Sequence, residues 1–497
     1  MAQSDALISL IQSLSKSERR YFKMQGALQA GGRSYLGLFE LLDKRKDAGS
    51  VKKLFEKQFS KSSYEAARKH LYKMLMRSLR NYETDKTIDT RLLNIIADVK
   101  ILLNKGLLES GFSEIERGKK LALQHEKFFY FLILARTELQ QLTLLEFPDV
   151  NESELLEKQE KINAVLYDEL FINKHASLCE ILLHRYIHQG VTRNEQSQEK
   201  LNDLLLEEFQ INANQRYHNF QSDKLHLHFQ STYFLMIGDA RQSLLEFYKL
   251  YKMYESIPLY WEEDPLYYIY LLNGILLNLR ALGEYSEMKT FIDRLADLCV
   301  NSAGIQILIQ HLIYQHSVAC NIGQEKFDDG LEYFNQFQKE SGLQSQAPPN
   351  VMASTHLITA ILFFGVGDFR KSLLFNNKAL TLPQRFISNH TYVVCRLLSL
   401  IIHIELNNDD LLVYAIKSFE RKLKSDKILF QVEKITLEFL KKWVSSSSKE
   451  RRQRLVDYAI QLKKIQDDKY DQQIFQSFDL LRWAEMRIEK ASPLTSF

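Results

Sequence analysis

Cations on one face of an N-terminal helix are the residues of this sequence best placed for chemistry. Apolar and small residues at helical spacing predict a helix over 62–82, with an inner face of Tyr64, Ala67, Leu71, Leu75, Ser78 and Tyr82. Lys69, Lys73, Arg77 and Arg80 then form a basic stripe on the opposite side. A basic helix can place cations on the phosphates of a nucleic acid. The stripe also fits a solvated face or a docking surface for an acidic protein, and no helix-turn-helix signature separates these three interpretations.

A second candidate is a pair of histidines, His184 and His188, which lie one helical turn apart. Two histidines at this spacing can bind a metal ion. A zinc hydrolase of the H-E-x-x-H type needs a Glu directly after the first histidine, but Arg185 occupies that position. We therefore interpret these histidines as structural or surface residues, and we predict no metal site and no cofactor.

Other enzyme motifs are missing from the sequence. It contains no phosphate-binding Gly-rich loop, no Gly-x-Ser-x-Gly nucleophile elbow and no paired-cysteine site. The four cysteines, Cys179, Cys299, Cys320 and Cys395, are far apart in apolar surroundings, which predicts buried free thiols in a reducing compartment. We predict a protein without enzymatic activity.

The composition favours an all-α fold. Of 497 residues 45% are hydrophobic, whereas only 18 are Gly and 7 are Pro, so turns are scarce and helices must be many. The net charge is +3, but residues 1–90 hold 18 Lys and Arg against 10 Asp and Glu, which sets this region apart. No window approaches about 18 uninterrupted apolar residues, and the N-terminus lacks a signal-peptide pattern. We predict a cytoplasmic protein that does not enter a membrane.

A turn motif of Gly followed by an acidic residue recurs at Gly238, Gly283 and Gly367. Turn glycines lie at 106, 190, 238, 283 and 367, with weaker equivalents near 148, 325 and 410, so that successive turns are 42 to 48 residues apart. Gly suits the left-handed conformation that ends a helix, and the acidic residue favours the start of the next one. An aromatic residue after the turn is expected to wedge between the two helices, and a small residue (Ser243, Gly330 or Ser372) to let them cross closely. The interval predicts about eight helix pairs between 88 and 428.

The turn resembles the second half of the tetratricopeptide repeat, most closely at Gly367, Asp368, Phe369, Ser372, Leu373, Ala379, Leu380 and Pro383. The family repeats every 34 or so residues, and the longer interval here is nearer that of HEAT and armadillo repeats, which remain the alternative. The resemblance implies an α-solenoid of about eight long tetratricopeptide-like helix pairs in a right-handed superhelix. It also implies that the first helix of each pair lines a concave groove that binds peptides or helices.

Three regions are predicted on this basis. Residues 1–87 form a basic helical N-terminal domain, residues 88–428 form the superhelix, and residues 429–497 form a helical cap. Within the cap a polar break at Ser445 to Ser448 precedes two expected helices, at 449–464 and 472–490.

The resemblance places a set of side chains toward the groove: His228, Thr232, Asn273, Leu277, Arg280, Gln315 and Phe364, together with Ala319, Leu357 and Ile361. Packing against an adjacent helix is the competing interpretation. The Lys, Asn and Arg set with which the family clamps a carboxylate is not reproduced, so binding of chaperone tails is not implied. We predict a non-enzymatic scaffold or adaptor that binds a protein or peptide in the groove. The alternative is a regulator whose N-terminal domain binds nucleic acid while the repeats sense a partner. The partner and the oligomeric state are not determined by the sequence.

Overall fold

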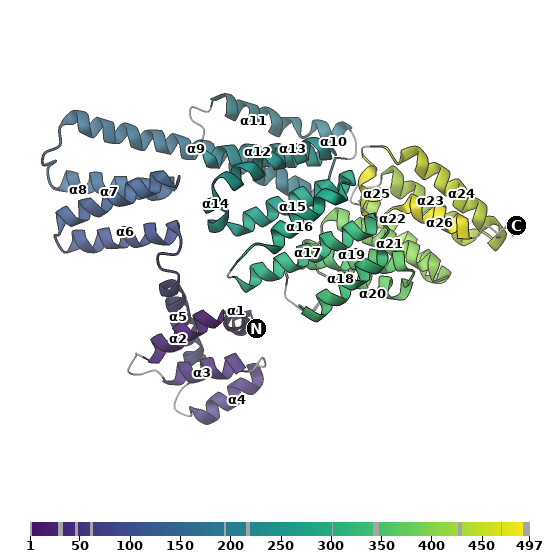
Figure 1. The fold of residues 1–497 in the computed structure, drawn as a ribbon, viewed down its shortest axis with the longest axis horizontal. Helices are drawn as coiled ribbons and strands as arrows, with labels where there is room; N and C mark the ends of the chain where they lie inside the picture. The colour runs from purple at the N-terminus through teal and green to yellow at the C-terminus, as the bar shows by residue number, and fades with distance from the viewer. Residues whose placement is uncertain are drawn as a thin grey trace. The chain divides into compact units, whose positions relative to one another are not determined.

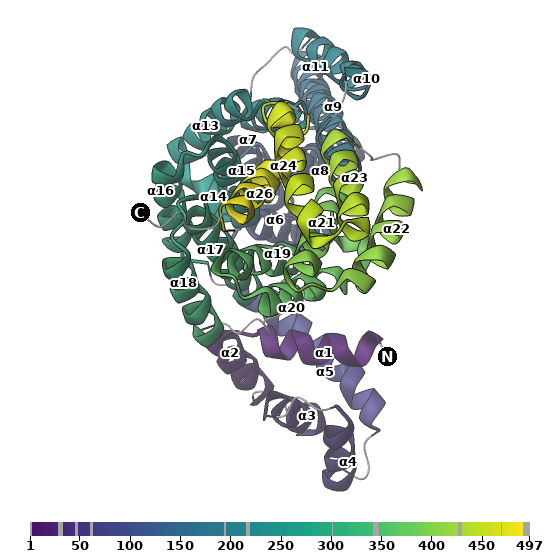
Figure 2. The same ribbon diagram turned by 90° about the vertical axis from the view of Figure 1, so that its right-hand side faces the viewer.

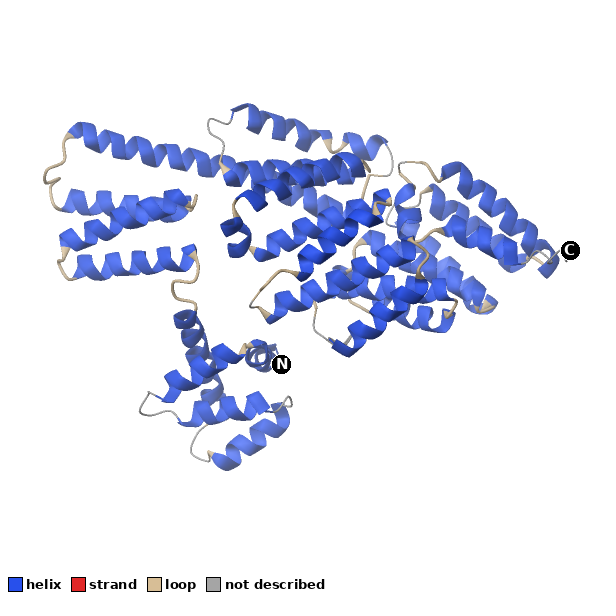
Figure 3. Cartoon of the chain, in the orientation of Figure 1, coloured by secondary structure: helices blue, strands red, loops and turns tan. Residues whose placement is uncertain are grey.

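The computed structural model describes residues 2–27, 33–44, 48–59, 63–192, 195–214, 219–300, 302–340, 347–425, 430–468 and 470–490. All regular secondary structure in these ranges is helical, and they contain no strand (Figure 3). The prediction of an all-α protein is thus confirmed. The structure forms two compact units, Met1–Phe171 with Cys299–Gln306 and Ile172–Leu298 with Ile307–Phe497.

Five helices at the N-terminus share one hydrophobic core (Figure 1). They are α1 (Ala2–Ser13), α2 (Lys16–Ala27), α3 (Arg33–Lys44), α4 (Ala48–Gln58) and α5 (Tyr64–Tyr82). Helix α5 packs on α2, α3 and α4, and it buries the inner face that its apolar spacing predicts. A capping box starts α2, because the Ser15 N–H donates to Glu18 Oε2 (2.7 Å) and the Glu18 N–H donates to Ser15 Oγ (3.2 Å).

Helices α6 (Ile88–Asn104), α7 (Leu108–Gln124) and α8 (Phe128–Leu144) follow, with α7 packed on both of its neighbours. The next helix, α9 (Glu152–Gln189), is continuous over 38 residues (Figure 1). The repeat interval predicts two helices and a break in this range, so the expected helix pair is wrong here. The physical reason is local, since no Gly or Pro lies between 152 and 189 to end the helix.

The second unit continues with helices that pack on their neighbours along the chain, as α12 does on α13, α15 on α16, α19 on α20 and α21 on α22. Their bounds are α10 (Glu195–Glu199), α11 (Asn202–Asn214), α12 (Phe220–Met236), α13 (Ala240–Ser256), α14 (Pro258–Glu263), α15 (Pro265–Leu282), α16 (Tyr285–Ala296), α17 (Ala303–Gly323), α18 (Phe327–Glu340), α19 (Pro349–Val366), α20 (Phe369–Leu380), a short 3-10 turn (Gln384–Phe386), α21 (Asn389–Glu405) and α22 (Asp409–Ser425). Among the described helices α19 alone is long and apolar enough to cross a membrane, and 56% of its span is buried against protein, as in a core helix.

The turn chemistry follows the prediction. Each of the five predicted turn glycines has a positive φ, for example 74° at Gly283 and 87° at Gly367. The acidic residue caps the next helix at two turns, where Asp239 accepts a hydrogen bond from the Gln242 N–H (3.0 Å) and Asp368 accepts one from the Lys371 N–H (3.0 Å). Glu284, at the N-cap of α16, makes no such side-chain hydrogen bond. All three weaker turns place non-glycine residues in the left-handed region, at Phe147, Glu325 and Asn407 among others.

Small residues bring the helices close together, and the aromatic residues after the turns divide into two groups. The buried Ser243 and Ser372 donate hydrogen bonds to carbonyls 12 residues earlier, at Ser231 (2.9 Å) and Ala360 (2.7 Å).

The Phe369 ring packs on Phe364 of the preceding helix, as we expected (5.3 Å between ring centroids). The rings of Tyr285 and Phe327, however, lie against Gly323 and Gly365, which belong to the following helix. A glycine on that helix offers the open surface that a ring needs.

The C-terminal helices are α23 (Gln431–Ser445), α24 (Ser448–Ile465), α25 (Gln472–Ser477) and α26 (Leu480–Lys490). Helices α24 and α26 lie side by side (Figure 1 and Figure 2). The break at Ser445 to Ser448 is confirmed, but the helix expected over 472–490 is split. Asp479 causes the split, because its carboxylate caps α26 by accepting from the Arg482 N–H (2.8 Å). One hydrophobic core runs from Tyr314 to Ala484, through the predicted boundary at 428.

The close approach between α13 and α15 yields a stability prediction. A Cβ added at Gly274 would lie 2.5 Å from the ring of Phe247, which is itself buried and cannot move aside. We expect Gly274→Ala to lower the free energy of unfolding by about 1–2 kcal/mol, because overpacking outweighs the gain in helix propensity. Urea unfolding measures this change.

Two further variants complete this test. Gly304→Ala, where an added Cβ meets only Ser302 Oγ at 3.9 Å, is the matched control and should leave stability unchanged or slightly raised. Adding Phe247→Leu to Gly274→Ala should recover part of the loss. A stabilising Gly274→Ala would show that the two helices are free to separate.

Candidate ligand-binding cavity

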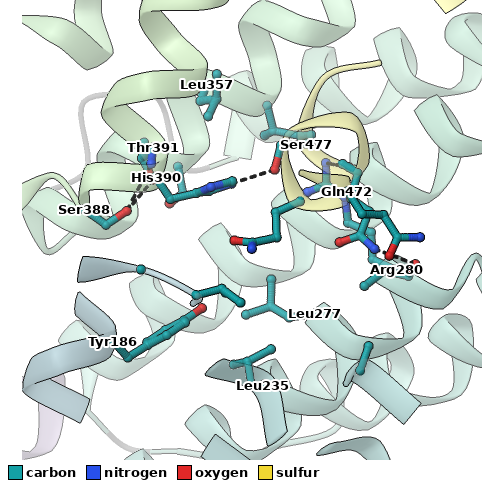
Figure 4. Close-up of a pocket in the computed structure, with 18 of the residues that line it drawn as sticks. Tyr186, Leu235, Leu277, Arg280, Leu357, Ser388, His390, Thr391, Gln472 and Ser477 are labelled. Carbon is teal, nitrogen blue, oxygen red and sulfur yellow. Dashed lines mark hydrogen bonds between the residues drawn. The ribbon is translucent and has the colours of Figure 1, made fainter. Parts of the chain in front are cut away.

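Three of the residues predicted for the groove, Leu277, Arg280 and Gln315, line one cavity of about 360 Å³ in the second unit (Figure 4). Leu357 and Ile361 line the same cavity. The wall comes mainly from α12, α15, α17, α19 and α21, which we call the first helices because each precedes a predicted turn, joined by the end of α9. The structure thus brings together residues that lie far apart in the sequence.

Helical spacing explains how each element contributes. On α15 Leu277 and Arg280 are three residues apart, in the last two turns before Gly283. The lining residues of α19 are spaced three or four positions apart, so they lie on one face of the helix: Ser354, Leu357, Ile358 and Ile361. Asp264 and Ser388 fix the starts of α15 and α21 by accepting from the N–H groups of Tyr267 (3.2 Å) and Thr391 (3.2 Å).

The chain's own helix α25 closes part of the cavity. Arg280 Nη2 donates to the Gln476 carbonyl (3.5 Å), and Gln476 Nε2 donates to the Ala281 carbonyl (3.3 Å). His390 Nε2 lies 2.8 Å from Ser477 Oγ, a contact that Figure 4 shows across the cavity. A short segment of polypeptide is therefore held against the first helices by both backbone and side-chain hydrogen bonds.

The other five predicted groove residues lie outside the cavity wall. The His228 ring is 3.0 Å from the Tyr267 hydroxyl, and Thr232 and Ala319 are buried. Asn273 Oδ1 lies 2.8 Å from His316 Nε2, and Phe364 packs on the rings of Phe369 and Phe478. For these positions the competing interpretation, packing against an adjacent helix, matches the observed contacts. The role of all ten residues in partner binding stays a prediction.

The cavity wall carries one cation without a matching carboxylate. Its described lining residues include Arg280 but no Lys, Asp or Glu. Burial lowers the pKa of Arg280 and lowers that of His316 to about 3, so this histidine is neutral at physiological pH. Burial also raises the pKa of Tyr186, so its hydroxyl stays protonated and can act as a hydrogen-bond donor.

Several residues that line the cavity were not predicted from the sequence. Tyr186 lies on α9, where the repeat pattern fails, and His390 and Thr391 lie in the first turn of α21. Gln472, Gln473, Gln476 and Ser477 belong to the segment that we assigned to a capping helix. Their glutamine-rich composition was the available signal, but composition alone does not show that a C-terminal segment returns to helices 190 residues earlier.

The predicted basic stripe lies on the surface of α5. Lys69, Lys73, Arg77 and Arg80 are all exposed, and none of them forms an ion pair with another described residue. Exposed Tyr72 lies between the first two lysines in sequence. Arg19 and Lys23 on α2, by contrast, both pair with Asp43.

The cysteines and paired histidines differ from one another in environment. Cys179 and Cys395 are buried, and burial raises the pKa of each thiol to about 12, as expected for structural cysteines. Cys299 is exposed, so the prediction of four buried thiols is wrong at this position. The rings of His184 and His188 are 4.4 Å apart, but the described residues contain no group of three His, Cys, Asp or Glu placed to hold a metal ion.

Comparison with known proteins adds no relative. No family model matches the chain, and no curated protein matches it. The resemblance to tetratricopeptide repeats therefore depends on the turn residues alone.

Buried histidines around the first helices give a pH prediction. Burial lowers the pKa values of His228, His311 and His356 to about 4 and that of His316 to about 3, below the value of about 6.5 expected when unfolded. Their contribution to stability is therefore present above about pH 6.5 and is lost as the pH falls toward the folded values. Each histidine should cost up to about 1.4 kcal/mol per pH unit in that window. Urea unfolding at about pH 7, 6 and 5 measures this loss.

A pair of variants isolates one histidine. His316→Gln keeps an N–H that can donate to Asn273 but does not titrate, so it should reduce the slope of unfolding free energy against pH. His184→Gln, at an exposed position on α9, should leave that slope unchanged. Equal slopes in the parent and His316→Gln proteins would contradict the assignment of a buried neutral histidine.

Proposed function

We propose that this protein is a non-enzymatic helical-repeat scaffold that binds a protein or peptide on the surface formed by the first helices of successive pairs. In this proposal α12 to α22 form a superhelix of long tetratricopeptide-like units. The recurring turn supports this, because Gly with positive φ, a capping acidic residue and a small residue at the crossing occur together at both 238–243 and 367–372.

The main support for the proposal is helix α25, which already lies against this surface. Helix α25 contacts α15 through Arg280, Ala281 and Gln476, and it contacts α21 through His390 and Ser477. Phe478 follows, with its ring 5.1 Å from that of Phe364. A surface that holds a short segment by backbone carbonyls, polar side chains and an aromatic anchor has the features of a peptide-binding groove.

Site-specific crosslinking tests where a partner binds. We expect benzoylphenylalanine in place of Leu277, at the cavity wall, to crosslink a discrete partner in the native lysate. The matched control places the same group at Leu374, an exposed leucine on α20 that does not line the cavity. Crosslinks of equal yield from both positions, or from Leu374 only, would contradict binding at the first helices.

We propose nucleic-acid binding through α5 as a second function, because of its four exposed cations without ion-pair partners among the described residues. If all four contact phosphates, affinity for duplex DNA should fall on the order of 100-fold between about 50 and about 200 mM salt. Reversing Lys69, Lys73, Arg77 and Arg80 to Glu should abolish this binding in the full chain. Fluorescence anisotropy with labelled duplex or single strands measures both effects.

The control for this experiment reverses four exposed lysines on other helices, Lys120, Lys417, Lys463 and Lys464. It changes the net charge by the same amount and should retain most of the affinity. If both sets of variants weaken binding equally, the interaction follows the net charge of the protein and not the stripe on α5.

A further inference from the structure

Arg280 lies half-buried in the cavity wall and differs from several other half-buried arginines of this protein. Arg185, Arg294 and Arg451 each pair with a carboxylate, at 2.9, 2.9 and 2.6 Å respectively. Arg487 likewise pairs with Glu405. Arg280 has no carboxylate partner among the described residues, and its one hydrogen bond there is the 3.5 Å contact to the Gln476 carbonyl.

The Arg280 guanidinium lacks the anionic partner that a charge inside a protein normally has. Burial disfavours its charged form, as the lowered pKa of Arg280 indicates, and such cations are usually paired with an anion. The cavity supplies none, because its described lining residues contain neither Asp nor Glu. The Tyr186 hydroxyl on the same wall also makes no hydrogen bond with a described residue. The Arg280 guanidinium and the Tyr186 hydroxyl can thus each donate further hydrogen bonds to a molecule in the cavity.

The remaining wall is apolar and limits the size of an occupant. Leu235, Leu277, Leu357 and Ile361 line the cavity, and its volume of about 360 Å³ suits a small molecule. Figure 4 shows Arg280 and Gln472 on one side, and Tyr186, Leu235 and Leu277 along another. An inorganic anion would satisfy the guanidinium but would leave the leucines in contact with water only.

We propose that this cavity binds a small organic acid, whose carboxylate pairs with Arg280 and whose apolar body lies against Leu277, Leu357 and Ile361. This site goes beyond the proposed scaffold function and does not depend on it, since binding of a small acid is measured here without any peptide partner.

Titration of the full chain with matched probes tests the ligand class. Hexanoate and benzoate carry a carboxylate on an apolar body, hexanamide and benzamide have nearly the same shape without charge, and inorganic phosphate has charge without an apolar body. We expect the two carboxylates to bind saturably in ligand-observed NMR, about 10- to 100-fold more tightly than the amides, because a charge-assisted pair with a guanidinium is lost in the amides. They should also bind more tightly than phosphate.

Variants test the named residues. Arg280→Met should weaken hexanoate binding about 10- to 100-fold, whereas Arg370→Met, at an exposed arginine on α20, should leave it unchanged. Without ligand, Arg280→Met should keep or raise the midpoint of thermal unfolding, since it removes an unpaired buried charge. Leu277→Ala should weaken hexanoate more than it weakens phosphate.

Three results would overturn the proposal. The first is equal affinity for carboxylates and amides, and the second is phosphate binding as tight as hexanoate binding. The third is a lower unfolding midpoint of ligand-free Arg280→Met, which would mean that the guanidinium already has the partners it needs. Failure to crosslink a partner from Leu277 would not bear on this site, so the two proposals are tested separately.

Discussion

Each long helix of the second unit must reverse direction within a few residues if the next helix is to bury its apolar face. The left-handed glycine makes this reversal possible, because a side chain at that φ would be strained. It also directs the following N–H groups back to the helix end, where Glu284 donates to the Leu279 carbonyl (2.9 Å) and Asp368 donates to the Phe363 carbonyl (3.0 Å). Ser243 and Ser372 then fit into the crossing and use their hydroxyls on the preceding helix.

The cavity lies where several helices of this unit meet, and side chains from α12, α15, α17, α19 and α21 converge there. The last two turns of α15 supply Leu277 and Arg280, and the middle of α19 supplies Leu357 and Ile361. Helix α25 covers part of the cavity, so one surface combines a peptide segment, an apolar wall and an arginine without a carboxylate partner among the described residues.

The N-terminal helices have a different organisation and offer a different kind of surface. Helices α1 to α5 bury their apolar residues in a core of their own, centred on side chains such as Phe39, Phe55 and Leu71. The outer side of α5 carries cations, which are exposed to solvent because this helix packs on its neighbours through its inner side. Charge and shape therefore separate two regions: a helix with a basic outer side, and a cavity with an arginine in an apolar wall.

The sequence by itself determined the helical class, the capping box of α2, the inner face of α5 and the five left-handed glycines, since each depends on residues within a few positions of one another. It also placed Leu277, Arg280 and Gln315 on one surface, because helical spacing and a repeated turn are local signals. The tertiary structure alone decided that α9 is unbroken, that Tyr285 packs on a glycine 38 residues later and that His228 is enclosed beside Tyr267. It also decided the return of α25 to α15, because a contact between residues about 195 positions apart depends on how every intervening helix stacks.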